Sequence, residues 1–465
     1  MAEQHAAERV SGAKLPSLEN VNKLKGALHG ELLRPGDDEY ESARRIHNGM
    51  IDRRPAMIVR CAGVADVMRA VSFAREHEML VAVRGGGHGV PGFAVCNDGM
   101  MIDLSRMKSV RVDPTRRTAR AEGGSTWGDF DPETQAFGLA TTGGLARPTG
   151  IAGLTLGGGQ GFLMRKHALA CDNLLSVDVV TADGGLVTAS VSENADLYWG
   201  VRGGGGNFGV VTSFEYRLHE LGPVLGGLVI YPMGQAQALL KFYREFTASA
   251  PDELGPLAVL ATLPDGTKAV VTLLCYSGAS AGGERLLRPL RNFGPPIADQ
   301  VSVMPYTAVQ GIVENFNPRG LRNYWKTLYM KKLTDDAIKV MVECYSTVPS
   351  PNTHVVLYTL GGAVARVAAD ETAVGFRDAC HALLIVGMWS EPAGDEANIR
   401  WVRQFWEKMQ PFASGGFYVN YEAETGLEKV KAAYGPHKFE RLAVLKTKYD
   451  PTNLFRLNQN IPPAG

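Results

Sequence analysis

Hydrophobic and polar positions in the first 220 residues alternate between strand-like and helix-like patterns. Short apolar runs at 57–59, 80–83, 100–104 and 177–180 predict buried strands. Helical spacing of apolar residues predicts helices over 17–28, 63–78 and 126–137. The helix over 63–78 presents its apolar residues on one face: Val64, Val67, Met68, Val71 and Ala74. This part of the chain therefore begins with a β-α-β unit.

The pattern changes beyond residue 221. Apolar runs predict strands at 257–263, 269–275 and 355–359, and helical spacing predicts helices at 233–250, 335–344 and 395–410. This combination indicates an antiparallel sheet with helices on one side. The chain has 465 residues, more than the roughly 250–300 at which a single hydrophobic core stops growing. We therefore expect two domains.

The strand predicted at 80–83 runs directly into the segment Arg84-Gly85-Gly86-Gly87-His88-Gly89. Glycines let a backbone approach a ligand closely, and their N–H groups can form a concave nest for a pyrophosphate. His88 at the edge of such a nest would be a nucleophilic imidazole directed at the bound group. The alternative is a glycine-rich turn beside a structural histidine.

Two further glycine clusters follow. Residues 157–161 contain four glycines and precede a helical pattern over 162–170, an arrangement that suits a phosphate group; tight packing of a glycine loop is the alternative. The segment from Gly204 to Gly209 formally satisfies G-x-G-x-x-G. However, a strand pattern at 209–216 follows it instead of a helix, so a Rossmann site for NAD is not predicted.

Four motifs in this order resemble one enzyme family. They are the His88 loop, the segments 148–166 and 196–211, and a C-terminal part that contains Tyr418-Val419-Asn420-Tyr421 and 450–462. Together they resemble the berberine bridge enzyme-like FAD-linked oxidases of the vanillyl-alcohol oxidase and p-cresol methylhydroxylase superfamily. The resemblance runs from about Pro55 to Pro463.

The resemblance implies an α+β, two-domain FAD-binding fold of the PCMH type. Its FAD-binding domain is discontinuous: it would comprise residues 1–220 together with a C-terminal return segment, 416–465, that packs back on it. Residues 221–415 would form the substrate-binding domain around an antiparallel sheet.

The resemblance also implies a set of FAD contacts. His88 aligns with the histidine that many relatives bond to the 8α carbon of the flavin. Doubly linked relatives carry a cysteine where this chain has Ala146, so we expect one link, through His88 only. The other expected cofactor contacts are Arg84, Gly85, Gly86, Gly87, Gly89, Thr149, Gly150, Gly153, Gly157, Gly158, Gly159, Gly161, Gly209, Val210, Val211, Tyr418 and Asn420.

Tyr421 is the candidate catalytic base by the same resemblance, taking a proton from substrate as hydride moves to flavin N5. A free phenol has a pKa of about 10, so a nearby cation or hydrogen-bond donor would have to stabilise the phenolate. The alternative for Tyr418, Asn420 and Tyr421 is a polar, extended edge segment.

The implied reaction is the two-electron oxidation of an alcohol or amine carbon in a small organic substrate, with oxygen as acceptor. Thr149 stands at the position that the family associates with oxygen access, and it is not aliphatic. A dehydrogenase with another acceptor therefore remains an alternative, as does a non-catalytic flavin-binding protein.

Aromatic residues beyond 221 are candidates for substrate contact, although aromatic side chains more often belong to a core. Phe376 stands where the family often has a histidine. His354 and His381 are expected to be structural. The substrate candidates are Tyr324, Trp325, Trp389 and Phe376.

The composition of the chain limits the classes of binding partner that we expect. Basic and acidic residues number 48 each, which argues against a nucleic-acid-binding surface. Six cysteines contain no Cys-x-x-Cys pair, so we expect no metal site. No apolar stretch reaches the ~20 residues of a membrane span, and residues 1–9 lack the apolar core of a signal peptide. The sequence predicts a cytoplasmic enzyme whose partners are a small substrate and an electron acceptor.

Overall fold

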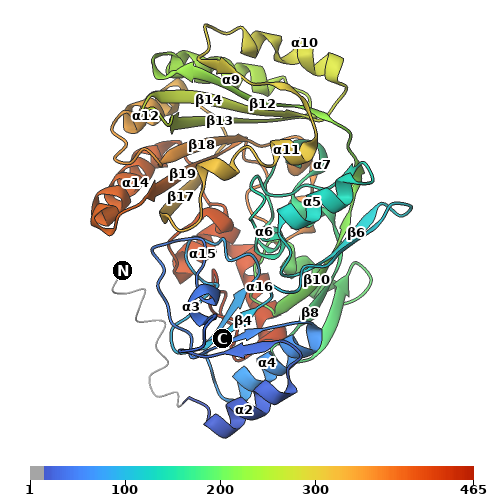
Figure 1. The fold of residues 1–465 in the computed structure, drawn as a ribbon. Coiled ribbons are helices and arrows are strands. Elements are labelled where there is room, and N and C mark those ends of the chain that lie inside the picture. Colours follow the sequence, from blue (N-terminus) through green and yellow to red (C-terminus); the bar gives the residue numbers. More distant parts are fainter. Residues whose placement is uncertain (1–14) are drawn as a thin grey trace.

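The computed structural model describes residues 15–465. The N-terminal residues 1–9, on which the expected cytoplasmic location partly rests, lie outside that range. Figure 1 shows the N-terminal sheets and the C-terminal helices in the lower half and a large sheet in the upper half. Peripheral elements are α2 (Leu18–Ala27), α3 (Tyr40–Ala43), α10 (Ser280–Arg291), α11 (Tyr306–Val309), α13 (Ala363–Arg366), β7 (Leu139–Ala140) and β11 (His219–Glu220).

The first sheet delivers the chain into the His88 loop. Its strand order is β1-β2-β4-β3, with β2 and β3 parallel to β4 and β1 antiparallel. Helix α4 (Val64–Glu76) connects β2 to β3 and buries Val67 and Val71, as its apolar spacing predicted. The strands are β1 (Glu31–Leu33), β2 (Met57–Arg60), β3 (Val81–Arg84) and β4 (Met100–Asp103).

The second sheet is antiparallel, with the order β5-β6-β10-β8-β9. The predicted strand after the Gly204–Gly209 segment is confirmed as β10. The strands are β5 (Val110–Asp113), β6 (Thr118–Glu122), β8 (Leu174–Val180), β9 (Leu186–Ser190) and β10 (Val210–Arg217). The helices of this region are α5 (Trp127–Gln135), α6 (Ile151–Leu156), α7 (Met164–His167) and α8 (Ala195–Val201).

The large antiparallel sheet has the order β15-β12-β14-β13-β18-β19-β17, and β16 pairs with β12. Helices α9 (Ala236–Ala248), α12 (Asp335–Ser346) and α14 (Asp395–Met409) pack on one face through residues such as Leu240, Ile338 and Phe405. The strands are β12 (Val224–Pro232), β13 (Leu254–Thr262), β14 (Lys268–Tyr276), β15 (Ala298–Asp299), β16 (Ser302–Met304), β17 (Arg322–Met330), β18 (His354–Thr359) and β19 (His381–Trp389).

The C-terminal segment returns to the N-terminal half (Figure 1). It comprises the 3₁₀ turn η7 (Val419–Tyr421), α15 (Leu427–Tyr434) and α16 (Pro436–Tyr449). Leu442 of α16 and Ala433 of α15 join the hydrophobic cluster that contains Leu197 of α8 and Phe214 of β10. The last and first parts of the chain therefore share one core.

Two local expectations differ from the structure. The helix predicted over 162–170 is only α7, because Ala168 has a positive φ (60°) and a 3₁₀ turn (Ala170–Asn173) follows. The extended edge segment considered as the alternative for Tyr418, Asn420 and Tyr421 is not found, because residues 419–421 form η7. Its shape is fixed by hydrogen bonds that the sequence pattern does not reveal, including one from the Gly159 amide to the Tyr418 hydroxyl (2.8 Å).

Candidate active site

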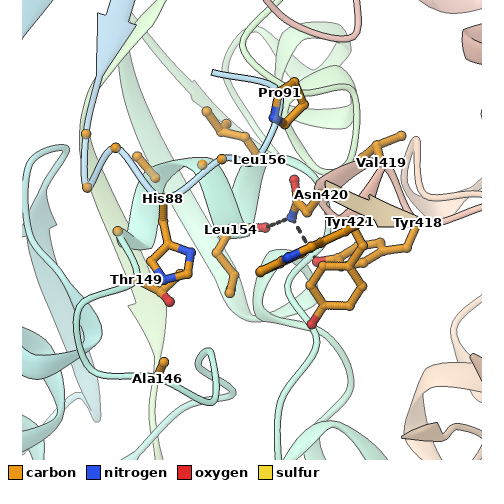
Figure 2. Close-up of a pocket in the computed structure, with 18 of the residues that line it drawn as sticks. His88, Pro91, Ala146, Thr149, Leu154, Leu156, Tyr418, Val419, Asn420 and Tyr421 are labelled. Carbon is orange, nitrogen blue, oxygen red and sulfur yellow. Dashed lines mark hydrogen bonds between the residues drawn. The ribbon is translucent and has the colours of Figure 1, made fainter. Parts of the chain in front are cut away.

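A cavity of about 400 Å³ lies between the glycine-rich loops and the open face of the large sheet. Figure 2 shows His88 and the Tyr418–Tyr421 segment entering it from different elements. Most of the predicted contacts meet there. The residues that line it from the predicted set are Gly85, Gly86, Gly87, His88, Gly89, Thr149, Gly150, Gly153, Gly209, Val210, Val211, Trp325, Tyr418, Asn420 and Tyr421.

Five predicted cofactor contacts do not line the cavity: Arg84, Gly157, Gly158, Gly159 and Gly161. Arg84 donates to the Ala43 carbonyl and lies 3.8 Å from a carboxylate oxygen of Asp103. A Cβ atom on Gly161 would lie 1.7 Å from the Gly143 carbonyl oxygen. A Cβ atom on Gly157 would lie 2.2 Å from the Asn420 side chain, and one on Gly159 would lie 2.4 Å from the Ala170 Cβ atom. These glycines therefore allow close packing against neighbouring residues, and the phosphate site predicted at 157–161 is not part of the cavity.

Three of the four aromatic substrate candidates also lie elsewhere. The Tyr324 hydroxyl bonds Glu424, and the Trp389 indole donates to Asp395 at 2.8 Å. Phe376 stacks on Tyr329 with ring centroids 6.1 Å apart. These three side chains make their contacts outside the cavity, and of the four only Trp325 lines it.

His88 is stacked on a second histidine, His47, with ring centroids 3.9 Å apart and ring planes inclined by 19°. Burial, followed by the electrostatic effect of His47, lowers the pKa of His88 to about 3. Its imidazole is therefore neutral at physiological pH, which leaves a ring nitrogen lone pair available as a nucleophile.

The cavity is suited to a large cofactor that binds against backbone. A Cβ atom on Gly89, Gly153 or Gly206, all of which line the cavity, would have no other heavy atom within 4 Å. Within residues 15–465, no protein group accepts a hydrogen bond from the amides of Gly85–Gly87. These free donors can bind the pyrophosphate of FAD.

The C-terminal segment adds polar atoms to the same cavity. The buried oxygens Asn458 Oδ1 and Gln459 Oε1 have no hydrogen-bond partner among the described residues. Because buried polar atoms are normally bonded, they are consistent with a bound polar group. The lining residues therefore fit FAD on two sides, through glycine amides and through C-terminal side chains.

Ala146, which was expected to replace the cysteine of doubly linked relatives, lines the cavity, and no cysteine lines the cavity in the described part of the chain. Cys171, the nearest cysteine in sequence, is fully buried in the hydrophobic cluster with Leu169 and Tyr418. No sulfur is placed for a second bond to a cofactor.

Tyr421 lies in an aromatic cluster. Its hydroxyl is 2.9 Å from that of Tyr358, and its ring is 4.7 Å from Tyr418 and 6.2 Å from Trp325. Burial, together with neighbouring Tyr358, raises the pKa of Tyr421 well above the usual value. Among the described lining residues there is no Lys, Arg, Asp or Glu. Of the cation or hydrogen-bond donor that the sequence-based mechanism required, the described lining residues supply no Lys or Arg, and the Tyr358 hydroxyl is the hydrogen-bonding group beside the phenol.

Asn420 and Tyr418 hold the turn in place. Asn420 Nδ2 donates to the Leu154 carbonyl and to the Tyr418 hydroxyl, both at 2.9 Å (Figure 2). The same Tyr418 oxygen accepts from the amides of Gly159 (2.8 Å) and Gln160 (3.3 Å). Residues 157–161 thus serve the site indirectly, by positioning the tyrosine segment.

Sequence reasoning missed several lining residues. Gly205, Gly206 and Asn207 line the cavity. The sequence pattern excluded a Rossmann site at the motif that contains them but did not identify these three residues as contacts. His354, expected to be structural, also lines it, together with Tyr358. The period-two alternation of His354, Val356 and Tyr358 on β18 is the signal that could have identified them.

No described helix is both long and apolar enough to cross a membrane. No group of three or more His, Cys, Asp or Glu side chains within residues 15–465 is arranged to hold a metal ion.

Comparison with known proteins agrees with this geometry. Residues 55–190 match the family model described as FAD binding domain, and residues 417–462 match the model described as berberine and berberine like. An FAD-linked oxidoreductase of Dictyostelium discoideum is 31% identical, covering 97% of this chain and 99% of the relative. The (R)-6-hydroxynicotine oxidase of Paenarthrobacter nicotinovorans is also 31% identical, covering 94% and 98%.

Solved structures show the same arrangement. The 6-hydroxy-D-nicotine oxidase of Arthrobacter nicotinovorans has a TM-score of 0.87 at 29% identity, covering 94% of this chain and 98% of that one. A berberine bridge enzyme variant has a TM-score of 0.87 at 20% identity, covering 97% and 99%, and shares the fold. The chain therefore belongs to the berberine bridge enzyme-like family of FAD-linked oxidoreductases, with their α+β, two-domain FAD-binding fold.

Proposed function

We propose that this enzyme is an oxidase that removes two electrons from an alcohol or amine carbon of a small, uncharged and largely apolar organic molecule. The observation that carries the proposal is one cavity that joins His88, Tyr421 and an apolar sheet face, with no charged side chain among its described lining residues. FAD, when bound, supplies the two-electron acceptor. Names of relatives such as 6-hydroxynicotine oxidase support a compact aromatic or heterocyclic substrate.

His88 would hold the flavin by a single covalent bond to the 8α carbon; the two electrons released when this bond replaces a C–H bond of the methyl group would pass through the flavin to its electron acceptor. The neutral state of His88 supports this assignment because only the unprotonated ring nitrogen is a nucleophile. Ala146 at the position of the second link supports a single bond. The amides of Gly85–Gly87 and the polar side chains of Asn458 and Gln459 supply non-covalent contacts.

Tyr421 accepts the proton of the substrate hydroxyl or amine. Its oxygen lies in the cavity beside Tyr358, and the tight turn around Asn420 fixes its direction. Because burial raises its pKa, little of the Tyr421 side chain is present at neutral pH as phenolate, the form that accepts a proton. Substrates whose oxidation does not require a base to remove an O–H proton, such as neutral amines, therefore suit this site better than simple alcohols.

Oxygen is the proposed electron acceptor, with a quinone or protein acceptor as the alternative. Relatives named as oxidases support oxygen, whereas Thr149 in the cavity lining leaves room for the alternative. Two measurements separate these acceptors: peroxide release during turnover in air, and reduction of an artificial dye during turnover without oxygen. Dye reduction without any peroxide release in air would identify a dehydrogenase.

The first experiment tests the flavin link. The purified holoenzyme is precipitated with acid, and flavin colour and fluorescence are measured in pellet and supernatant. We expect flavin in the pellet for the parent and in the supernatant for His88→Ala. Flavin in the parent's supernatant would refute the covalent bond. A protein that refuses added FAD would support the non-catalytic alternative.

A further inference from the structure

The open face of the large sheet forms a regular wall of the cavity. On β18, His354, Val356 and Tyr358 line the cavity, whereas Val355 and Leu357 point into the helix-covered core. This alternation follows from the two-residue period of a strand. The three lining residues therefore form a straight row on one face.

The surface around this row is apolar. Val356 pairs with Val259 of β13 and Leu384 of β19, and both neighbours line the cavity. Next to His354, the paired residue is Val386, which in turn pairs with Trp325. The remaining apolar residues on this face of the cavity are Leu228, Leu257, Ala261, Val271 and Leu273.

Polar groups interrupt this wall at two positions on β18. Tyr358 bonds Tyr421, the proposed proton acceptor. His354 lies four residues earlier, so at ~3.3 Å per residue its Cα is about 13 Å from that of Tyr358. A molecule that spans the wall between them meets an apolar surface with one polar group at each end.

The hydrogen bond of His354 determines which of its ring nitrogens can accept a hydrogen bond from a ligand. Its Nδ1 is 3.3 Å from the carbonyl oxygen of Asn352. A carbonyl oxygen can only accept, so Nδ1 carries the proton and Nε2 carries a lone pair. Burial lowers the pKa of His354 to about 4, so the ring is neutral at pH 7. Within residues 15–465, no group bonds Nε2.

We propose that His354 is a specificity-determining residue that accepts a hydrogen bond from a hydroxyl or N–H group at the end of the substrate remote from the oxidised carbon. The substrate class that follows is a rigid, uncharged, apolar molecule with a donor at its far end. The proposal rests on the proposed function and names the substrate class of the same cavity.

The test uses two matched probes on the holoenzyme. Both are biphenyls with a hydroxymethyl group at one para position; one carries a hydroxyl group and the other a fluorine at the opposite para position. Dissociation constants are measured from the change in the flavin absorption spectrum, and kcat and KM from flavin reduction and turnover.

We expect the parent to bind the hydroxyl probe roughly three- to tenfold more tightly than the fluoro probe, as one buried neutral hydrogen bond allows. His354→Leu should reduce this ratio to about one, through KM and not kcat, while leaving fluoro-probe binding unchanged. His354→Gln, which retains an acceptor, should restore part of the preference. The matched control is His381→Leu: His381 is buried on adjacent β19 but does not line the cavity, so the ratio should persist.

Equal binding of the two probes by the parent, or a preference that survives His354→Leu, would overturn the assignment. Failure of both probes to bind would overturn the proposed substrate class. Binding with the expected preference but without flavin reduction would support the role of His354 and count against oxidation of these alcohols. The two proposals can therefore fail separately.

Discussion

At the scale of single residues, the environment of each titratable side chain decides its chemistry. His88 and Tyr421 both lie in a cavity without charged lining residues among those described. Burial disfavours the charged form of either group, so it keeps the histidine as a neutral nucleophile and the tyrosine as a neutral phenol. The same apolar surroundings thus favour the flavin link and reduce the fraction of Tyr421 that is present as the basic phenolate.

The lowered pKa of His88 predicts how the flavin link forms. FAD added to apoprotein from a riboflavin-depleted host should become covalently bound at nearly the same rate between about pH 5 and 8, because a group with a pKa of about 3 stays neutral throughout that range. A histidine with the ordinary pKa of about 6.5 would slow more than tenfold toward pH 5. The acid-precipitable flavin fraction is followed with time, and a decline through pH 6.5 would contradict the prediction.

The raised pKa of Tyr421 predicts the opposite dependence for catalysis. The rate constant of flavin reduction by an alcohol substrate should rise with pH from about 7 to 10, because the phenolate fraction increases as the pH approaches a raised pKa. Tyr421→Phe should lower that rate by about 10²–10⁴-fold, the usual contribution of a general base, and abolish the rise. Stopped-flow absorbance provides both values; Tyr434→Phe, another buried cavity tyrosine, is the control.

At the scale of elements, glycine clusters of similar sequence perform different tasks. Gly205 and Gly206 line the cavity, whereas Gly159 and Gly161 pack against neighbouring backbone and side chains. Glycine content alone cannot separate these cases, because both ligand approach and close packing require the absence of a Cβ atom. Tertiary contacts decide between them.

Gly206→Val tests the cavity role of its loop. A side chain at this position would project into free space, so the fold should be retained while the volume available to the cofactor falls. We expect a several-fold lower flavin content per protein, with an unchanged circular dichroism spectrum. Gly234→Val is the matched control: it also lies in open space, but outside the cavity. Equal flavin content in both variants would remove Gly206 from the cofactor site.

Sequence patterns predicted local elements well where one face is buried. The helices α4 and α9, each with one buried face, lie where the periodicity placed them. Strands β17 and β19 were missed because eight of the nine residues of β17 and all nine of β19 are buried, so neither strand shows a period-two alternation. Ordered motifs placed His88 and Tyr421 in one site, whereas the neighbours that add to the effect of burial on their pKa values, His47 and Tyr358, depend on long-range packing that periodicity does not encode.

At the scale of the whole molecule, one buried lysine joins the C-terminal segment to the cavity loops. Lys446 Nζ lies 2.6 Å from Asp450 and donates to the carbonyls of Asn207 (2.7 Å) and Phe455 (3.0 Å). Both side chains of the ion pair are fully buried. Since Asn207 and Phe455 line the cavity, this pair couples the packing of α16 to the shape of the cofactor site.

Lys446→Met should therefore destabilise the protein and reduce its flavin content together. The substitution leaves the Asp450 charge buried with only two amide donors, from Leu454 and Phe455, a defect that typically costs about 3–5 kcal/mol. Lys448→Met is the control on the same helix, because its ion pair with Asp196 is exposed and should contribute only about 0–1 kcal/mol. Thermal unfolding by circular dichroism and flavin content per protein measure both effects. Equal thermal unfolding midpoints for the two variants would show that the buried ion pair does not stabilise the return segment. A lowered midpoint of Lys446→Met with full flavin content would show that the ion pair stabilises the fold without affecting the cofactor site.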